Sequence, residues 1–239
     1  MNSRNLLTAG ILTLGLNSGA HAVLIDDFDG ASGTVGAECT FGPTDETNGA
    51  PIGGTRTLSC SNETGFVTFG TIDSPAPTID EVLSYAAVPG SKADPSVIWD
   101  AAGTGLGGLD LTLNNAEQFV FSVAFLDGPG GTYPPGNFAF TLEVVDTSLN
   151  TWSFAGDSGP NPLIDMDFVI PFSAGTGELS ALKDADKISL LMTSNYLGVD
   201  FAIDSLSTEI PIPAPLALMG LGLLGIAGVR RRLAEALAA

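Results

Sequence analysis

The sequence predicts an all-β fold, an antiparallel β-sandwich of jelly-roll type, with a targeting segment at each end of the chain. Short stretches that alternate apolar with polar side chains, or are rich in β-branched and aromatic residues, recur through residues 23–209. Clusters of glycine and proline at 128–131, 134–136 and 159–162 separate them. Because many short strands without helices between them build sandwiches, the pattern predicts two packed antiparallel sheets.

The predicted strands follow one another at short intervals. In chain order they are residues 24–28, 56–61, 66–71, 80–85, 97–99, 109–113, 118–125, 138–145, 151–154, 167–172, 187–193 and 199–206. Only residues 184–186 suggest a helical turn, and residues 31–55, rich in glycine, threonine and proline, predict a long loop. We expect one domain over residues 23–209, since a stretch of this length can bury its own core.

Residues 1–22 have the pattern of a secretory signal peptide. Arg4 precedes an apolar run over residues 6–16, which is too short to span a bilayer and so argues against a retained anchor. An A-x-A triplet follows, and the residues that define the predicted cleavage are Ala20, Ala22 and Val23, the last of which begins the mature chain.

The chain is strongly acidic, with 27 acidic and 8 basic residues and a formal net charge of −19. The cations within residues 23–209 are Arg56, Lys92, Lys183 and Lys187. Such a surface repels nucleic acid, attracts divalent cations and keeps an exported protein dispersed. We therefore expect no nucleic-acid partner. A solvated acidic surface without any specific partner is the simplest account of the charge.

Cys39 and Cys60 are the two cysteines of the chain. Export would bring them into an oxidising compartment, where thiols pair, so we expect a disulfide between them. Closing this loop is worth about 3 kcal/mol in the chain-entropy model. Metal binding by the pair is disfavoured, because the spacing is long and the mature chain would have no histidine to join them.

Residues 210–239 have the pattern of a membrane-directed tail. Residues 210–229 carry no charge, and a cluster of arginines follows at Arg230, Arg231 and Arg232. A helix over residues 213–229 would be about 25 Å long, just enough to span a hydrocarbon core of about 30 Å. The arginines predict a cytoplasmic C-terminus, with everything before residue 210 outside. The alternative is a buried core helix.

This tail resembles the bacterial PEP-CTERM sorting tail, which has the same order of a proline pair, a short apolar span and basic residues. Here the prolines are Pro211 and Pro213. The resemblance implies an exosortase-type processing enzyme as partner and the cell envelope or extracellular matrix as destination, with the helix in the inner membrane before any processing. Two features depart from the family: Ile212 stands where the usual motif has Glu, and residues 233–239 continue past the arginines.

The inventory of residues argues against an enzyme. The single histidine, His21, leaves with the predicted signal peptide, and the cysteines are expected to pair, which excludes histidine-based triads and histidine-ligated zinc. A glycosidase needs two carboxylates. However, the predicted strand around Glu143 lacks the E-x-D-x-E arrangement common in jelly-roll glycan hydrolases. We expect no catalytic residues, and a polysaccharide hydrolase is the least favoured function.

Acidic stretches open and close the predicted domain. Residues 24–30 read Leu-Ile-Asp-Asp-Phe-Asp-Gly, and residues 199–206 end in Ile-Asp-Ser-Leu. They resemble the first and last strands of carbohydrate-binding jelly-roll modules, in which these strands lie together and their acids hold a structural calcium. The resemblance implies calcium ligands at Asp27, Asp29 and Asp204, with carbonyls and water completing six to eight oxygens. The alternative is that these acids, and Asp26, only cap strand ends. No other cofactor is expected.

Five aromatic residues can stack on sugar rings if they lie at the surface: Tyr85, Trp99, Tyr133, Trp152 and Tyr196. The Gly/Pro-rich loop around Tyr133 predicts exposure, whereas Trp99 and Trp152 lie in strand patterns that favour the core. Tyr133 and Trp152 are the residues to test as glycan contacts. We expect an exported, non-catalytic β-sandwich with a structural or adhesive role. The alternative is a glycan-binding module for exopolysaccharide.

Overall fold

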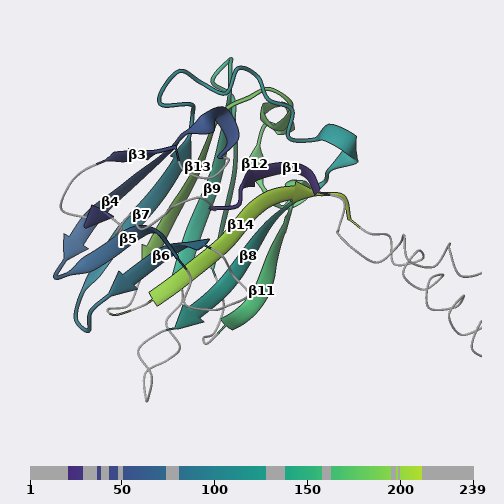
Figure 1. Ribbon diagram of the computed structural model, residues 1–239. Coiled ribbons are helices and arrows are strands. Elements are labelled where there is room, and N and C mark those ends of the chain that lie inside the picture. Colours follow the sequence, from purple (N-terminus) through teal and green to yellow (C-terminus); the bar gives the residue numbers. More distant parts are fainter. Residues whose placement is uncertain are drawn as a thin grey trace, which may run out of the picture. The chain divides into compact units, whose positions relative to one another are not determined.

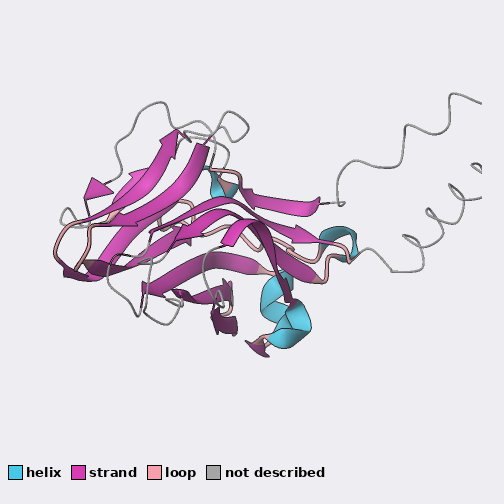
Figure 2. Ribbon diagram, turned by 90° about the horizontal axis from the view of Figure 1, so that it is seen from below, coloured by secondary structure: helices cyan, strands magenta, loops and turns pink. Residues whose placement is uncertain are grey.

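Two antiparallel seven-stranded sheets stack face to face, and short 3₁₀ turns provide the helical structure of the described chain (Figures 1 and 2). The computed structural model describes residues 21–28, 37–38, 43–47, 51–73, 81–127, 138–157, 163–194, 198 and 200–211. His21–Glu209 is one compact unit. The predicted all-β antiparallel sandwich of two sheets is therefore confirmed.

The first sheet, which we call sheet A, has the order β11-β8-β14-β6-β5-β2, with β1 paired to β14. Its strands are β1 (His21–Asp26), β2 (Ala37–Glu38), β5 (Val67–Asp73), β6 (Glu81–Ala87), β8 (Gln118–Asp127), β11 (Leu163–Pro171) and β14 (Asp200–Glu209). β14 lies at its centre: β8 pairs along one side of it, while β6 and β1 share the other.

The second sheet, sheet B, has the order β12-β10-β9-β13-β7-β4-β3. Its strands are β3 (Thr44–Glu46), β4 (Arg56–Thr64), β7 (Lys92–Trp99), β9 (Phe138–Asp146), β10 (Thr151–Asp157), β12 (Thr176–Gly177) and β13 (Ala185–Ser194). The 3₁₀ turns are η2 (Ile52–Gly54), η3 (Leu113–Asn115), η4 (Phe172–Ala174) and η5 (Leu179–Lys183).

The core lies between the sheets because alternate side chains of each strand point inward. β7 shows this most simply, since burial changes at every residue from Lys92 to Trp99. The neighbouring strands of sheet B contribute inward residues such as Leu142, Ile188 and Leu190, and sheet A contributes Phe119, Phe201 and others. Tyr85 of β6 stacks on Phe201 of β14 with ring centroids 5.1 Å apart.

The first and last strands of the domain lie side by side, as the resemblance to carbohydrate-binding modules implied. In the antiparallel pair of β1 and β14, His21 faces Glu209 and Asp26 faces Leu206 (Figure 1). The backbone N–H of Val23 also donates to the Thr208 hydroxyl, at 3.1 Å. The chain therefore enters and leaves this domain at neighbouring positions.

Three predicted elements are wrong in detail. Residues 109–113 do not form a strand: Leu109 makes a single bridge to Ala185, and Asp110 then closes a turn by accepting from the N–H and hydroxyl of Thr112. A helical turn was predicted at residues 184–186, but the 3₁₀ turn η5 ends before them, at Lys183. Strand β13 begins at Ala185, within the predicted turn. The predicted loop at 31–55 contains β2, β3 and η2, because tertiary pairing turns short, weakly patterned segments into edge strands.

Asp146 ends β9 and holds the turn to β10 in shape. Its carboxylate accepts hydrogen bonds from the N–H of Ser148 at 2.8 Å, the N–H of Asn150 at 2.7 Å and the side-chain amide of Asn150 at 2.8 Å. These bonds, led by that of the Asn150 side chain, lower the pKa of the Asp146 carboxyl. The strand around Glu143 thus ends in an acid that shapes the following turn.

Both targeting segments lie almost wholly outside the described residues. This includes the leader up to Ala20, Pro213, the predicted span at 213–229 and the arginines Arg230, Arg231 and Arg232. Pro211 is half-buried just after β14. Within the described ranges, no helix has the length and apolar character needed to cross a membrane.

Candidate functional site

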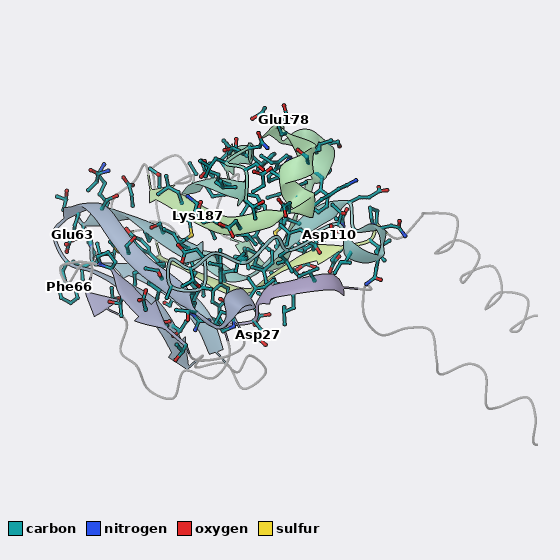
Figure 3. All side chains as sticks on the ribbon, turned by 90° about the horizontal axis from the view of Figure 1, so that it is seen from above. Asp27, Glu63, Phe66, Asp110, Glu178 and Lys187 are labelled. Carbon is teal, nitrogen blue, oxygen red and sulfur yellow. The ribbon has the colours of Figure 1, made fainter. Side chains whose placement is uncertain are left out.

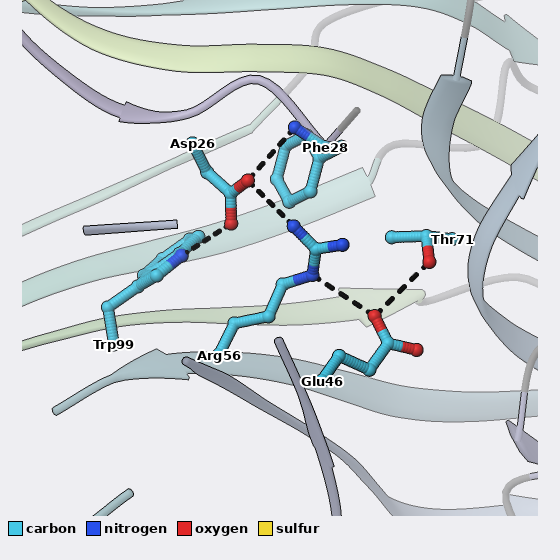
Figure 4. A network of polar contacts seen from close by, with 6 residues as sticks. All are labelled: Asp26, Phe28, Glu46, Arg56, Thr71 and Trp99. Carbon is cyan, nitrogen blue, oxygen red and sulfur yellow. Dashed lines mark hydrogen bonds and ion pairs between the residues drawn. The ribbon is translucent and has the colours of Figure 1, made fainter. Parts of the chain in front are cut away.

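A charged network is buried at the N-terminal strand (Figure 4). Asp26, at the end of β1, is fully buried, and three donors converge on its carboxylate. Nη1 of Arg56 lies 2.7 Å from Oδ1, the indole nitrogen of Trp99 lies 2.7 Å from Oδ2, and the N–H of Phe28 lies 2.9 Å from Oδ1. Strands β1, β4 and β7, from both sheets, are thereby joined through one carboxylate.

Arg56 carries the network across to β3 and β5. Its Nε donates to Oε2 of Glu46 at 3.1 Å, and the hydroxyl of Thr71 donates to the same oxygen at 3.2 Å. The guanidinium also lies over the Phe28 ring, 5.3 Å from its centroid. Nη2 of Arg56 is the one buried side-chain nitrogen or oxygen without a hydrogen-bond partner in the described ranges. One cation thus serves two buried carboxylates.

Burial raises the pKa of the Asp26 carboxyl, although the positive charge of Arg56 and the hydrogen bonds from Trp99, Phe28 and Arg56 act in the opposite direction. Such a group is expensive to bury and depends on its partners. We assign the network a structural role, because its side chains bond to one another and, among the described residues, only Nη2 of Arg56 is buried without a partner. The sequence contains one indication of this buried network. Arg56 is one of very few cations in the chain, and it falls at an inward position of a strand, where its charge needs a buried acid as partner.

Two of the three candidate calcium ligands lie among the described residues. Asp27 and Asp204 are half-buried at neighbouring strands, whereas Asp29 lies outside the described residues. Among the residues the structure describes, no group of three or more His, Cys, Asp or Glu side chains is placed to hold a metal ion. Calcium binding therefore stays a prediction that depends on Asp29. Asp26, which was predicted at most to cap a strand end, instead forms a buried ion pair with Arg56.

Trp152, which was named as a residue to test for glycan contact, lies in the core, as its strand pattern favoured. The residue is fully buried, its indole N–H donates to the carbonyl of Phe172 at 3.0 Å, and its ring packs against Phe119 with centroids 5.4 Å apart. Trp99 and Tyr85 are equally buried. These three aromatic residues occupy strand positions whose side chains point inward, so their rings pack in the core. Tyr133 lies outside the described residues, as does Tyr196.

Cys60, in β4, is half-buried and is not a free thiol. Cys39 lies outside the described residues, so the pairing of these two cysteines stays a prediction.

The outward side of sheet B is a largely polar surface that crosses seven strands, and we call it the open face. One row of residues, paired strand by strand, crosses all seven strands. In order it consists of Asp45, Thr57, Ile98, Ser189, Glu143, Ser153 and Thr176. At about 4.8 Å between strands the row is roughly 30 Å long. A second row beside it consists of Ser59, Ser96, Leu191, Thr141 and Ala155.

The open face is accessible at its centre. Leu191 lies on the central strand β13 and is 45% exposed, so the described chain does not cover the middle of the face. Small hydroxyl side chains pair along the rows, as Ser59 does with Ser96 at 2.7 Å. Lys187 and Glu143 form an ion pair at 3.8 Å, with both side chains 39% exposed. The surface offers hydrogen-bond donors and acceptors over many strands.

Comparisons with known proteins return similar solved structures. No protein-family model matches the sequence, and no curated protein matches it. The solution structure of CtCBM11 is 12% identical with a TM-score of 0.46, covering 82% of this chain and 99% of that chain. The family 11 carbohydrate-binding module of the cellulase Lic26A-Cel5E from Clostridium thermocellum is 10% identical with a TM-score of 0.41, covering 81% and 96%. An exo-β-agarase is 12% identical with a TM-score of 0.45, covering 82% of this chain and 25% of that chain. At these identities and TM-scores the likeness says nothing about what this chain binds.

Proposed function

We propose that this chain is an exported, non-catalytic β-sandwich that binds polysaccharide through the open face of sheet B. The observation that carries the proposal is the outward row across all seven strands, in which every residue except Ile98 carries a hydroxyl or carboxylate group. A polysaccharide is a long chain of hydroxyl groups, and a long flat surface of small polar side chains can exchange hydrogen bonds with several sugar units at once. The net charge of −19 favours neutral over anionic polymers, because like charges repel.

The expected result is retention of the full chain, purified in detergent, by at least one neutral polysaccharide. We would measure binding isotherms on insoluble β-glucan and on agarose, with polygalacturonate as the anionic comparison. Ser189→Arg places a large side chain at the centre of the open face and should weaken binding about tenfold or more.

Thr68→Arg is the matched control. It makes a similar replacement of a small hydroxyl side chain by arginine on β5, facing outward from the other sheet, where Thr68 donates to the carbonyl of Ala86 at 3.4 Å. Equal binding by the two variants would remove the open face as the site. A wild-type chain that none of the neutral polymers retains would contradict the function itself.

A structural or adhesive role at the cell surface is the second candidate, and it rests on the tail. The pairing of Val23 with Thr208 supports it, because the first residue of the predicted mature chain then lies beside the strand that leads into the tail. We propose that the leader is cut before Val23 and that an exosortase-type enzyme recognises Pro211, Pro213 and Arg230–Arg232. A structural calcium at Asp27, Asp29 and Asp204 belongs to the same proposal.

Intact mass of the protein recovered from cells tests this targeting. We expect a chain that begins at Val23 and has lost the residues after about Pro213. A mass that includes residues 1–22 would contradict export. A mature N-terminus with a complete C-terminus would contradict processing and leave the tail as an anchor.

A further inference from the structure

Two exposed apolar residues lie side by side where the chain crosses between the sheets. Phe66 joins β4 to β5 and is 50% exposed, and Val88 joins β6 to β7 and is 47% exposed. The N–H of Val88 donates to the carbonyl of Phe66 at 3.2 Å. We call this pair the tip. Among the phenylalanine, tyrosine and tryptophan side chains whose exposure the structure describes, Phe66 is the most exposed.

The tip lies at the opposite end of β14 from Glu209, where the chain leaves the domain. Its neighbour Ala87 donates its N–H to Asp200, at the start of β14, whereas the chain leaves the domain at Glu209, the last residue of β14. Ten residues of strand separate these ends by about 30 Å. Figure 3 shows Phe66 and Glu63 together at one end of the molecule. A domain held by its chain ends would present Phe66 outward.

The backbone holds Phe66 in place. The side chain of Ser91, which is 3% exposed, accepts from the N–H of Phe66 at 2.9 Å, and the N–H of Ser91 donates to the carbonyl of Val88 at 2.9 Å. Gly65 has a φ of +80°, and a Cβ there would lie 2.1 Å from the Ser91 hydroxyl. The aromatic ring is therefore presented by a fixed crossover, which lowers the entropy lost when a ligand binds.

The tip continues the open face. Moving from that face toward the tip along β4 and β7, the paired residues are Ser59 with Ser96, Ser61 with Asp94, and Thr64 with Lys92. Asn62 also donates to the Asp94 carboxylate at 2.6 Å. An apolar ring thus stands next to a path of hydroxyl, amide and charged groups. Pyranose rings have the same division, with C–H groups on their faces and hydroxyls at their rims.

We propose that Phe66 is the stacking platform for a pyranose ring of a neutral polysaccharide that extends along β4 and β7 onto the open face. The proposal rests on the proposed polysaccharide binding and adds its aromatic contact. Val88 completes the apolar surface beside the ring, and the C–H groups of the sugar contact the π-face of Phe66. Aromatic side chains that become buried on binding often carry a large share of the binding free energy.

The test compares Phe66→Ala, Phe66→Trp and Leu149→Ala in the full chain, purified in detergent. Leu149 is the matched apolar control, since it is 82% exposed in the β9–β10 turn. We would measure isotherms on the neutral polysaccharide that retains the wild type. Phe66→Ala should weaken binding about tenfold or more, while Phe66→Trp should keep it and Leu149→Ala should leave it unchanged.

Three outcomes separate this inference from the function on which it rests. In the first outcome the wild type binds, Ser189→Arg binds more weakly, and Phe66→Ala binds as well as Leu149→Ala. This result would overturn stacking on Phe66 but would still support binding at the open face. If Phe66→Trp fails as fully as Phe66→Ala while both keep the wild-type melting temperature, stacking is also overturned. If the wild type binds no neutral polymer, the proposed function fails first and takes the platform with it.

Discussion

Replacing Arg56 by methionine should lower the free energy of unfolding by about 3–5 kcal/mol, a large part of the stability of a typical domain. The change leaves Asp26 and Glu46 buried without their shared cation, and both carboxylates lose a hydrogen bond, at 2.7 and 3.1 Å. Urea unfolding followed by tryptophan fluorescence would measure the loss, since Trp99 donates directly to Asp26.

Lys187→Met is the matched control, because it removes the same charge from an ion pair of sheet B in which both side chains are 39% exposed. Solvent screens that pair, so the expected cost is only about 0–1 kcal/mol. If the two variants lost the same stability, the buried network would not hold β1 to the rest of the domain.

The pH dependence gives a second measure of the network. Because burial raises the pKa of Asp26 above 3.8, the folded state binds more protons than the unfolded state between the two pKa values. The Asp26 contribution to stability is therefore fully present below about 3.8 and is lost as the pH rises through the folded pKa. In Arg56→Met the pKa of Asp26 should rise further, so the decline should extend to higher pH. An unchanged profile would contradict the assignment.

Replacing Trp152 by alanine should cost about 3–5 kcal/mol, as expected for emptying a packed aromatic site. Its ring lies against Phe119 and Phe172, with centroids 5.4 and 6.4 Å away. A Cβ on Gly175 would lie 2.2 Å from the ring, so the backbone there fits this side chain closely. Denaturant unfolding would measure the lost stability. Trp152→Phe should lose less stability than Trp152→Ala because it keeps an aromatic ring in the core, although it loses the hydrogen bond to the Phe172 carbonyl.

Leu191→Ala is the comparison for Trp152, because it removes an apolar side chain from the outward side of the same sheet and is expected to cost far less. The folded fraction of Trp152→Ala should still bind polysaccharide like the wild type. A variant that stayed as stable as the wild type but lost binding would restore Trp152 as a glycan contact.

The sequence by itself determined the class of fold and most of its strands. Alternation along Lys92–Trp99 and the inward positions of β9 and β13 are local patterns, because side chains of a strand point to opposite faces with a period of two. The same patterns placed Trp99 and Trp152 in strands that favour burial, and turn residues marked where strands end. The resemblance of residues 24–30 and 199–206 to known first and last strands led to the expectation that these lie together.

Only the tertiary structure decided which distant residues meet. Asp26 and Arg56 are 30 positions apart and Asp26 and Trp99 are 73 apart, so no local period records their contacts. The row of the open face depends on the register of seven strands, and the exposure of Phe66 depends on two crossovers that come together. Register and crossover are set by packing and pairing energies summed over the whole domain, and these have no signature in any single stretch of sequence.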